Sequence, residues 1–299
     1  MQKSMRIGVL IAAAGIAGLA GCGTTPAGQP GSAKPSATAT SSPQSSATTP
    51  APSSPSAMPT PSSTPASAPR ACPQAGNYLT SVRVGEHAGY DRVVFQFSGG
   101  MPAWDVNRVA AVYQDPKGTP VALAGQSYLR VVFRGATAWC AQPPHQTYTG
   151  PSALTPFYPE LLVVGSAGDF EGYLSFGIGL AAAGGYHAYA LTAPDRLVID
   201  VSHVTLGKFP GIDITSWQEY WQLQYAWNNG HQPWRASPIQ VVEAWVRQWG
   251  TTPVVRQVDA NTFKVTEPSG RIDTVTGIRP VTVPGPWVIT SVVYGSPQA

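Results

Sequence analysis

The chain has 299 residues, and its 18 Lys and Arg residues nearly balance 15 Asp and Glu residues, so that only 11% of the chain is charged. Nucleic-acid binding needs clustered basic side chains that neutralise phosphates, and this composition excludes it. The 31 glycines, 30 prolines, 9 tryptophans and 12 tyrosines are typical of an exported protein rich in strands and turns.

The first residues indicate a cleavable export signal. Lys3 and Arg6 form a short positive region, and residues 7–20 form an apolar stretch. A helix needs roughly 20 apolar residues to cross a hydrocarbon core of about 30 Å, so this stretch is too short to span one stably. We therefore predict a signal peptide over residues 1–21.

The signal ends in Leu19-Ala20-Gly21-Cys22, which resembles the lipobox of bacterial lipoprotein precursors. The resemblance implies a diacylglycerol on the Cys22 sulfur, cleavage before this residue, and fatty acylation, for example with palmitate, of the new amine. Buried acyl chains contribute about 0.8 kcal/mol per CH₂ group, so we expect a stable anchor in the cell membrane and an extracytoplasmic protein. An ordinary signal peptide with an incidental cysteine is the alternative.

The next segment is expected to be a disordered linker over residues 22–71. It is almost wholly Ser, Thr, Pro, Ala and Gly, and Lys34 is its only charge before Arg70. Such a composition cannot bury enough apolar surface to offset the entropy of ordering. Stretched at about 3.1 Å per residue, it would reach about 150 Å. Its Ser, Thr and Pro content suits O-glycosylation, and a simple unmodified spacer is the alternative.

Two cysteines lie beyond the linker, Cys72 and Cys140. A pair of cysteines in an oxidising compartment most simply forms one disulfide. Closing a loop of this length stabilises a fold by roughly 4 kcal/mol in the loop-entropy model. Two free buried thiols are the alternative.

Residues 72–204 are predicted to form an antiparallel β-sandwich. Short stretches rich in β-branched and aromatic residues are separated by turn residues, and no helical period of useful length interrupts them. The expected strands are residues 78–84, 92–97, 104–113, 128–133, 160–164, 173–178, 186–191 and 196–201.

Two of these strands begin alike, because Asp91-Arg92 and Asp195-Arg196 each lead from a turn into an apolar run. The ordered set of residues 91–95, 98–100, 120–123 and 194–201 resembles the AMIN-like domain of actinobacterial lipoproteins, over residues 78–204. The resemblance implies a β-sandwich that localises a protein to the cell envelope, with peptidoglycan or another wall polymer as its ligand. It implies no catalytic residue.

Residues 213–299 are predicted to form a small α+β domain with two helices on a β-meander. Ser216 and Glu219 have the spacing of a capping box at the start of the first helix. Pro238 occupies the first position of the second helix. The aromatic residues of both helices are expected in the core, because their spacing is that of a buried helix face. The expected strands are residues 254–258, 262–267, 272–281 and 287–293.

No recognised motif for catalysis, metal binding or cofactor binding is present, so we expect no catalytic residue, no metal and no cofactor. The histidines are scattered singly, and no paired His or Cys spacing suits zinc. Asp169 and Glu171 come closest to an acid–base pair, since residues two apart share a strand face. They precede a turn-like Gly172 and are expected to be solvated.

Aromatic side chains near loops and strand ends are the candidates for function, since their rings can stack on sugar faces. For each of them a place in the core is the alternative. Two or three exposed together would indicate a binding site. The candidate glycan-binding residues are Trp104, Trp139, Tyr148, Tyr158 and Tyr173, with Phe157 beside them in the sequence.

The sequence thus predicts a lipid-anchored envelope protein that is not an enzyme. Its expected partners are the membrane, through the lipid, and peptidoglycan or another wall glycan. A second hypothesis is an interaction scaffold with an envelope protein as its partner. A third is an enzyme with an unrecognised site, which would require ionisable groups that converge in a deep cleft.

Overall fold

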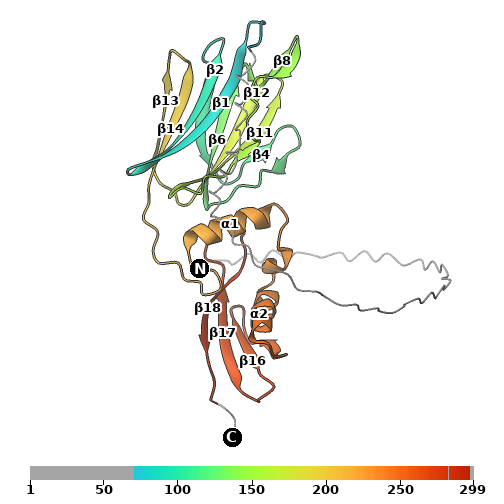
Figure 1. The fold of residues 1–299 in the computed structure, drawn as a ribbon. Helices are drawn as coiled ribbons and strands as arrows, with labels where there is room; N and C mark the ends of the chain where they lie inside the picture. Colours follow the sequence, from blue (N-terminus) through green and yellow to red (C-terminus); the bar gives the residue numbers. More distant parts are fainter. Residues whose placement is uncertain (1–70, 282, 297–299) are drawn as a thin grey trace, which may run out of the picture. The chain divides into compact units, whose positions relative to one another are not determined.

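The computed structural model describes residues 71–281 and 283–296 (Figure 1). The described residues are mainly β, with 45% strand and 12% helix, and a β-rich domain precedes a small C-terminal part with two helices and strands. This confirms the predicted fold class. The predicted signal peptide, Cys22 and residues 22–70 of the predicted linker lie outside the described residues. Within the described ranges, no helix is long and apolar enough to cross a membrane.

The β-rich domain consists of two five-stranded sheets whose buried side chains form one core (Figure 1). Its strands pair antiparallel except β1 and β7, which pair in parallel at only two positions. The first sheet has the order β13-β14-β2-β1-β7, with β1 Asn77–His87, β2 Tyr90–Ser98, β7 Ala136–Thr137, β13 Tyr186–Leu191 and β14 Arg196–Ser202. The second has the order β10-β11-β12-β6-β3, with β3 Ala103–Val109, β6 Ser127–Arg134, β10 Ala153–Leu154, β11 Leu161–Phe170 and β12 Tyr173–Leu180.

Alternating burial along the strands explains why the two sheets pack. In β2 and β6 every second side chain is buried, as expected for strands with one face on a core. Phe95 of the first sheet lies 5.3 Å, between ring centroids, from Phe133 of the second and 5.0 Å from Phe176. Such aromatic pairs contribute roughly 0.5–1.5 kcal/mol each beyond the burial of their surface.

Two short hairpins lie outside both sheets. One joins β4 (Tyr113–Gln114) to β5 (Thr119–Pro120), and the other joins β8 (Trp139–Ala141) to β9 (Pro144–Gln146). The strand expected at residues 104–113 is shorter in the structure, because β3 ends at Val109. The chain leaves the sheet there because Val112 is buried in a second core.

A buried carboxylate fastens the two sheets to each other. Asp91, at the start of β2, is fully buried. Its Oδ2 accepts hydrogen bonds from the backbone N–H groups of Glu160 (2.9 Å) and Leu161 (2.8 Å), which lead into β11. Its Oδ1 lies 2.9 Å from Nε2 of His203, just after β14. Asp91 thus connects both sheets of the sandwich.

Glu160 is also fully buried, and it is only partly satisfied. Its Oε1 accepts hydrogen bonds from the N–H groups of Ala182 and Gly184, whereas Oε2 is buried without a partner among the described residues. Burial raises the pKa of this carboxyl above its ordinary value of 4.5, and the nearby Asp91 carboxylate adds to the effect.

The C-terminal part contains a four-stranded antiparallel meander with one face covered by a helix. Helix α2 (Pro238–Val246) packs Val241, Val242 and Val246 against Phe263 and Val275 of the sheet. The short 3₁₀ helices Pro233–Ala236 and Arg247–Trp249 flank α2. The sheet has the order β15-β16-β17-β18, with β15 Val254–Gln257, β16 Thr262–Thr266, β17 Ile272–Ile278, β18 Val288–Val293 and α2 spanning Pro238–Val246.

Helix α1 (Trp217–Asn228) belongs to a second core that also contains residues of the β-rich domain. Ser216 Oγ accepts the N–H of Glu219, which confirms the predicted cap, and the Glu219 carboxylate accepts from the N–H of Thr215. Tyr220 and Trp221 share this core with Leu123 and Leu162 of the β-rich domain and Val288 of β18. Gln224 Oε1 accepts the N–H of Gly125 at 2.7 Å. The β-rich domain and the C-terminal part are therefore packed together through α1.

This shared core predicts that the two parts unfold together. Replacing Trp221, which is 2% exposed, with Ala should lower the free energy of unfolding by about 3–5 kcal/mol. Denaturant unfolding followed by far-UV circular dichroism should show one transition that moves as a whole. The exposed Gln222→Ala on the same helix serves as the control and should change stability little. A separate transition of the β-rich domain that stays in place in W221A would contradict the shared core.

The raised pKa of Glu160 predicts a specific pH dependence of stability. The folded protein binds this proton more tightly than the unfolded chain, so the contribution to stability is full below the ordinary glutamate pKa and is lost as the pH rises through the raised pKa. Glu160→Gln stays neutral, so the variant should gain stability over the wild type as the pH is raised from acid to neutral. Urea unfolding at a series of pH values measures this difference. Glu86→Gln, at an exposed position, is the control, and an equal pH dependence of E160Q and wild type would refute the assignment.

Candidate binding site

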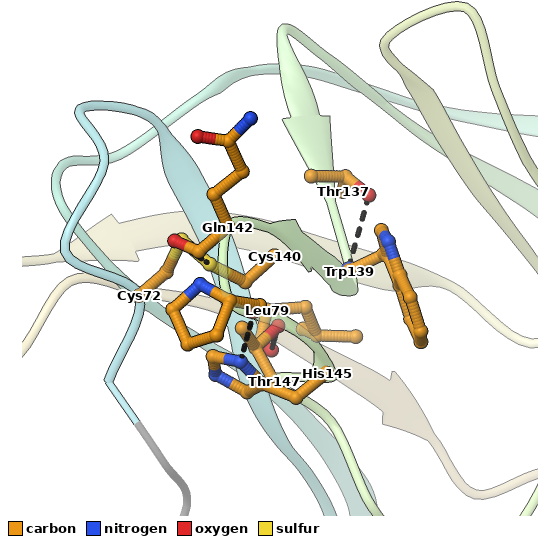
Figure 2. The surroundings of a disulfide bond; sticks show 9 residues. Cys72, Leu79, Thr137, Trp139, Cys140, Gln142, His145 and Thr147 are labelled. Atoms are coloured by element: carbon orange, nitrogen blue, oxygen red, sulfur yellow. Dashed lines mark hydrogen bonds between the residues drawn. A yellow bond between two sulfur atoms is a disulfide. The ribbon is translucent and has the colours of Figure 1, made fainter.

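The β8–β9 hairpin presents the most exposed tryptophan in the β-rich domain. The Trp139 side chain is 48% exposed, whereas the next residue, Cys140, is fully buried. Cys140 forms a disulfide with Cys72, with a Cα–Cα distance of 5.5 Å, which confirms the predicted pair. Successive side chains of a strand point to opposite faces. Accordingly, Figure 2 shows the Trp139 indole projecting away from the disulfide.

Hydrogen bonds hold both ends of this hairpin. Thr147, which is 1% exposed, donates its hydroxyl to the carbonyl of Leu79 in β1 at 2.8 Å (Figure 2). Its N–H donates to the carbonyl of Ala138 at 2.9 Å. The N–H of Trp139 donates to the Thr137 hydroxyl at 3.1 Å. The disulfide and these bonds fix the backbone that carries Trp139 before any ligand arrives.

Two hollows adjoin Trp139, and both also include Asp169 of β11. Their volumes, about 510 Å³ and about 330 Å³, fall in the range of small-molecule sites. The larger is lined by residues 75–78, 135–137, 139, 169, 171 and 172. The smaller is lined by Ala138, Trp139, Gln146, Tyr148, Gly150, Ser152, Ser166, Asp169, Leu174 and Phe176.

The carboxylates singled out in the sequence lie at this site. Asp169 is exposed, and its Oδ2 accepts hydrogen bonds from the Thr137 hydroxyl and the Ala138 N–H, both at 2.8 Å. Its Oδ1 has no hydrogen-bond partner among the described residues, so it can accept one from a ligand. Glu171 lines only the larger hollow, from the turn between β11 and β12.

Tyr148 is the second predicted aromatic residue at the site. It is half-buried, lines the smaller hollow, and donates its hydroxyl to the carbonyl of Pro151 at 3.0 Å. Burial raises the pKa of Tyr148, which keeps its phenol protonated. The structure therefore brings Trp139 and Tyr148 together around one hollow.

The other predicted aromatic residues lie elsewhere. Trp104 and Tyr158 pack against the sandwich core, and Tyr158 lines a different hollow beside Trp217 and Trp221. Phe157 lies 6.1 Å from Tyr225, between ring centroids. Tyr173 is 51% exposed at the start of β12 and pairs across the hairpin with Phe170, but it lines neither hollow at Trp139.

Sequence reasoning missed the polar side chains that complete the smaller hollow, Gln146, Ser152 and Ser166. They come from three separate segments, and no spacing in the sequence marks them as neighbours. In the described part of the chain, no group of three or more His, Cys, Asp or Glu residues could hold a metal ion.

The opening and closing motifs of the β-rich domain meet in its first sheet. Arg92 and Asp200 are register partners in β2 and β14. The guanidinium donates to both carboxylate oxygens, at 2.6 Å from Nε and 2.8 Å from Nη2. This bidentate pair links residues near the two ends of the domain.

The chain was compared with known protein families and structures. Residues 77–203 match the AMIN-like domain family. No curated protein and no solved structure matches the chain. The match indicates an extracytoplasmic location in the cell envelope. The chain thus contains an AMIN-like domain at residues 77–203, and this match suggests a binding module related to the cell wall.

Proposed function

We propose that this protein is anchored to the cell membrane by a lipid on Cys22 and binds peptidoglycan or another wall polymer, without catalysis, through its β-rich domain. Three features support the proposal. They are the AMIN-like domain, the resemblance of residues 19–22 to a lipobox, and the site at Trp139. The predicted linker, residues 22–71, would let the domain work away from the bilayer.

The observation that carries the proposal is an exposed indole on a fixed hairpin between two hollows. The face of an indole ring is its negative region, which attracts the C–H groups on a sugar face. Asp169 and Gln146 lie beside the ring and offer hydrogen bonds to hydroxyl groups. Because both hollows share Trp139 and Asp169, a chain of sugar rings can occupy them in succession. Fixing the hairpin in advance lowers the entropic cost of binding.

The arrangement of the carboxylates favours binding over catalysis. One oxygen of Asp169 is committed to Thr137 and Ala138, so this side chain holds the hairpin as well as facing the hollows. Glu171 stands on the exposed turn that follows β11. Neither is placed in a deep, dry cleft of the kind that proton transfer to a substrate requires.

One observation favours the alternative, an interaction scaffold for an envelope complex. Phe170 and Tyr173 are 45% and 51% exposed and lie opposite each other at the β11–β12 turn. Adjacent exposed aromatic residues are typical of protein contacts. Chemical crosslinking in cells that recovers one defined partner, lost in Phe170→Ala with Tyr173→Ala, would support this function.

The lipid anchor predicts a simple change in partitioning. Cys22→Ala removes the acylated thiol, so the variant should move from the detergent phase to the aqueous phase in a Triton X-114 partition. Cys72→Ser with Cys140→Ser controls for loss of other cysteines and should stay in the detergent phase. A C22A variant that still partitions with detergent would show that Cys22 does not carry the lipid anchor.

The Trp139 site predicts a loss of wall binding. The wild type should be retained by purified wall sacculi above the level of the linker alone, and Trp139→Ala should weaken retention at least tenfold, which corresponds to about 1.4 kcal/mol. Tyr113→Ala is the matched control, because Tyr113 is 52% exposed and lines neither hollow. Equal retention of W139A and wild type would rule out this site, and no retention of the wild type would rule out a wall ligand.

A further inference from the structure

We propose that the C-terminal part carries a second ligand site, which takes a neutral sugar with an N-acetyl group. The site is a hollow of about 460 Å³. It is formed by the segment before α1, the 3₁₀ helix at Pro233–Ala236 with Gln232 before it, α2, and the 3₁₀ helix at Arg247–Trp249. It shares no residue with the hollows at Trp139, so the proposal does not depend on the function proposed for the β-rich domain.

A buried ion pair forms part of the wall of this hollow. Arg235 Nη1 lies 2.9 Å from Asp213 Oδ2, and the two side chains are only 10% and 5% exposed. Asp213 Oδ1 accepts the N–H of Ile289 at 2.7 Å. Arg235 also donates from Nη1 to the carbonyl of Trp287 and from Nε to Oε1 of Gln232. These bonds fix both side chains, and their charges cancel, so the hollow favours a neutral ligand over an ion.

The pair leaves one donor for a ligand. The hydrogen bonds of Arg235 to the described residues come from Nε and Nη1, and none comes from Nη2. Nη2 is not among the enclosed polar atoms that lack a partner, so it keeps some exposed surface. We place this surface in the hollow because Arg235 lines it. A charged donor in a partly dry hollow binds a carbonyl oxygen well.

Apolar and aromatic side chains surround this donor. Trp234 and Trp245 are half-buried and line the hollow, together with Val241 and Ala244 of α2. Ile212 is 44% exposed at the same place. The Arg235 guanidinium carbon already lies over the Trp234 ring, 4.8 Å from its centroid. The remaining ring surface of Trp234 and the Trp245 indole can contact the C–H groups of a sugar ring. The ligand must therefore combine a ring, a small apolar group and a carbonyl.

An acetamido group on a pyranose ring meets these requirements. Its carbonyl can accept from Arg235 Nη2, and its methyl group can lie against Val241 or Ala244. The amides of Gln232 and Gln248 line the hollow from exposed positions and can bond to ring hydroxyls or to the acetamido N–H. A sugar without the acetamido group offers neither the methyl group nor the carbonyl.

The test is calorimetric titration of the lipid-free mature chain with chitotriose, a trimer of N-acetylglucosamine, and with cellotriose, which lacks the acetamido groups. It is performed in the Trp139→Ala background, which removes the site proposed for the β-rich domain. We expect saturable binding of chitotriose with one site per chain. Cellotriose should bind at least tenfold more weakly.

Two further variants locate the site. Trp245→Ala should weaken chitotriose binding at least tenfold, and Gln248→Ala should weaken it severalfold. Gln248 is exposed, so Q248A keeps the test valid should W245A fail to fold, as judged by circular dichroism. Gln240→Ala is the matched control, because Gln240 is exposed on α2, the helix that carries Trp245, and does not line the hollow.

The outcomes separate the two sites. No saturable binding in W139A, equal affinity for cellotriose, or full affinity in Q248A would each overturn the second site. None of these results bears on retention of the wild type by sacculi, which tests the site at Trp139.

Discussion

The hydrogen bonds of Asp91 are the interaction on which the sandwich depends. A buried carboxylate is costly unless its oxygens are paired, and both oxygens of Asp91 have partners. Those partners lie on the second sheet and just after the last strand of the first. The adjacent Arg92 points to the opposite face and binds Asp200. One Asp-Arg dipeptide therefore joins sheet to sheet on its inner side and strand to strand on its outer side.

Patterns that depend on near neighbours were predictable from the sequence. Alternation of side chains predicts β2 and β6 to within about two residues, because one face of each strand meets the core. The apolar run at residues 197–199 predicts β14. The Ser216 cap depends only on groups three residues apart and was predicted as well. The Cys72–Cys140 disulfide was predictable because the described region contains only two cysteines and the compartment is oxidising.

Features that depend on distant segments were not predictable. The strand expected at 104–113 ends early because Val112 packs in a core formed partly by Tyr220, more than a hundred residues later. Trp139 was one of several equal aromatic candidates, and only the fold shows that Tyr148 shares its hollow whereas Tyr158 does not. No sequence pattern predicted the hollow at Arg235, because the buried ion pair between Arg235 and Asp213 is a tertiary contact.

The position of the disulfide has a mechanical consequence for an anchored protein. Cys72 is the second described residue, and Cys140 directly follows Trp139 in the chain. With a ligand on Trp139 and a lipid at the other end of the predicted linker, tension between wall and membrane would run from Trp139 through one peptide bond and one S–S bond to the linker. That path is covalent throughout, so pulling would load neither β-sheet. The sandwich can stay folded while the hairpin bears the strain of a wall that moves against its membrane.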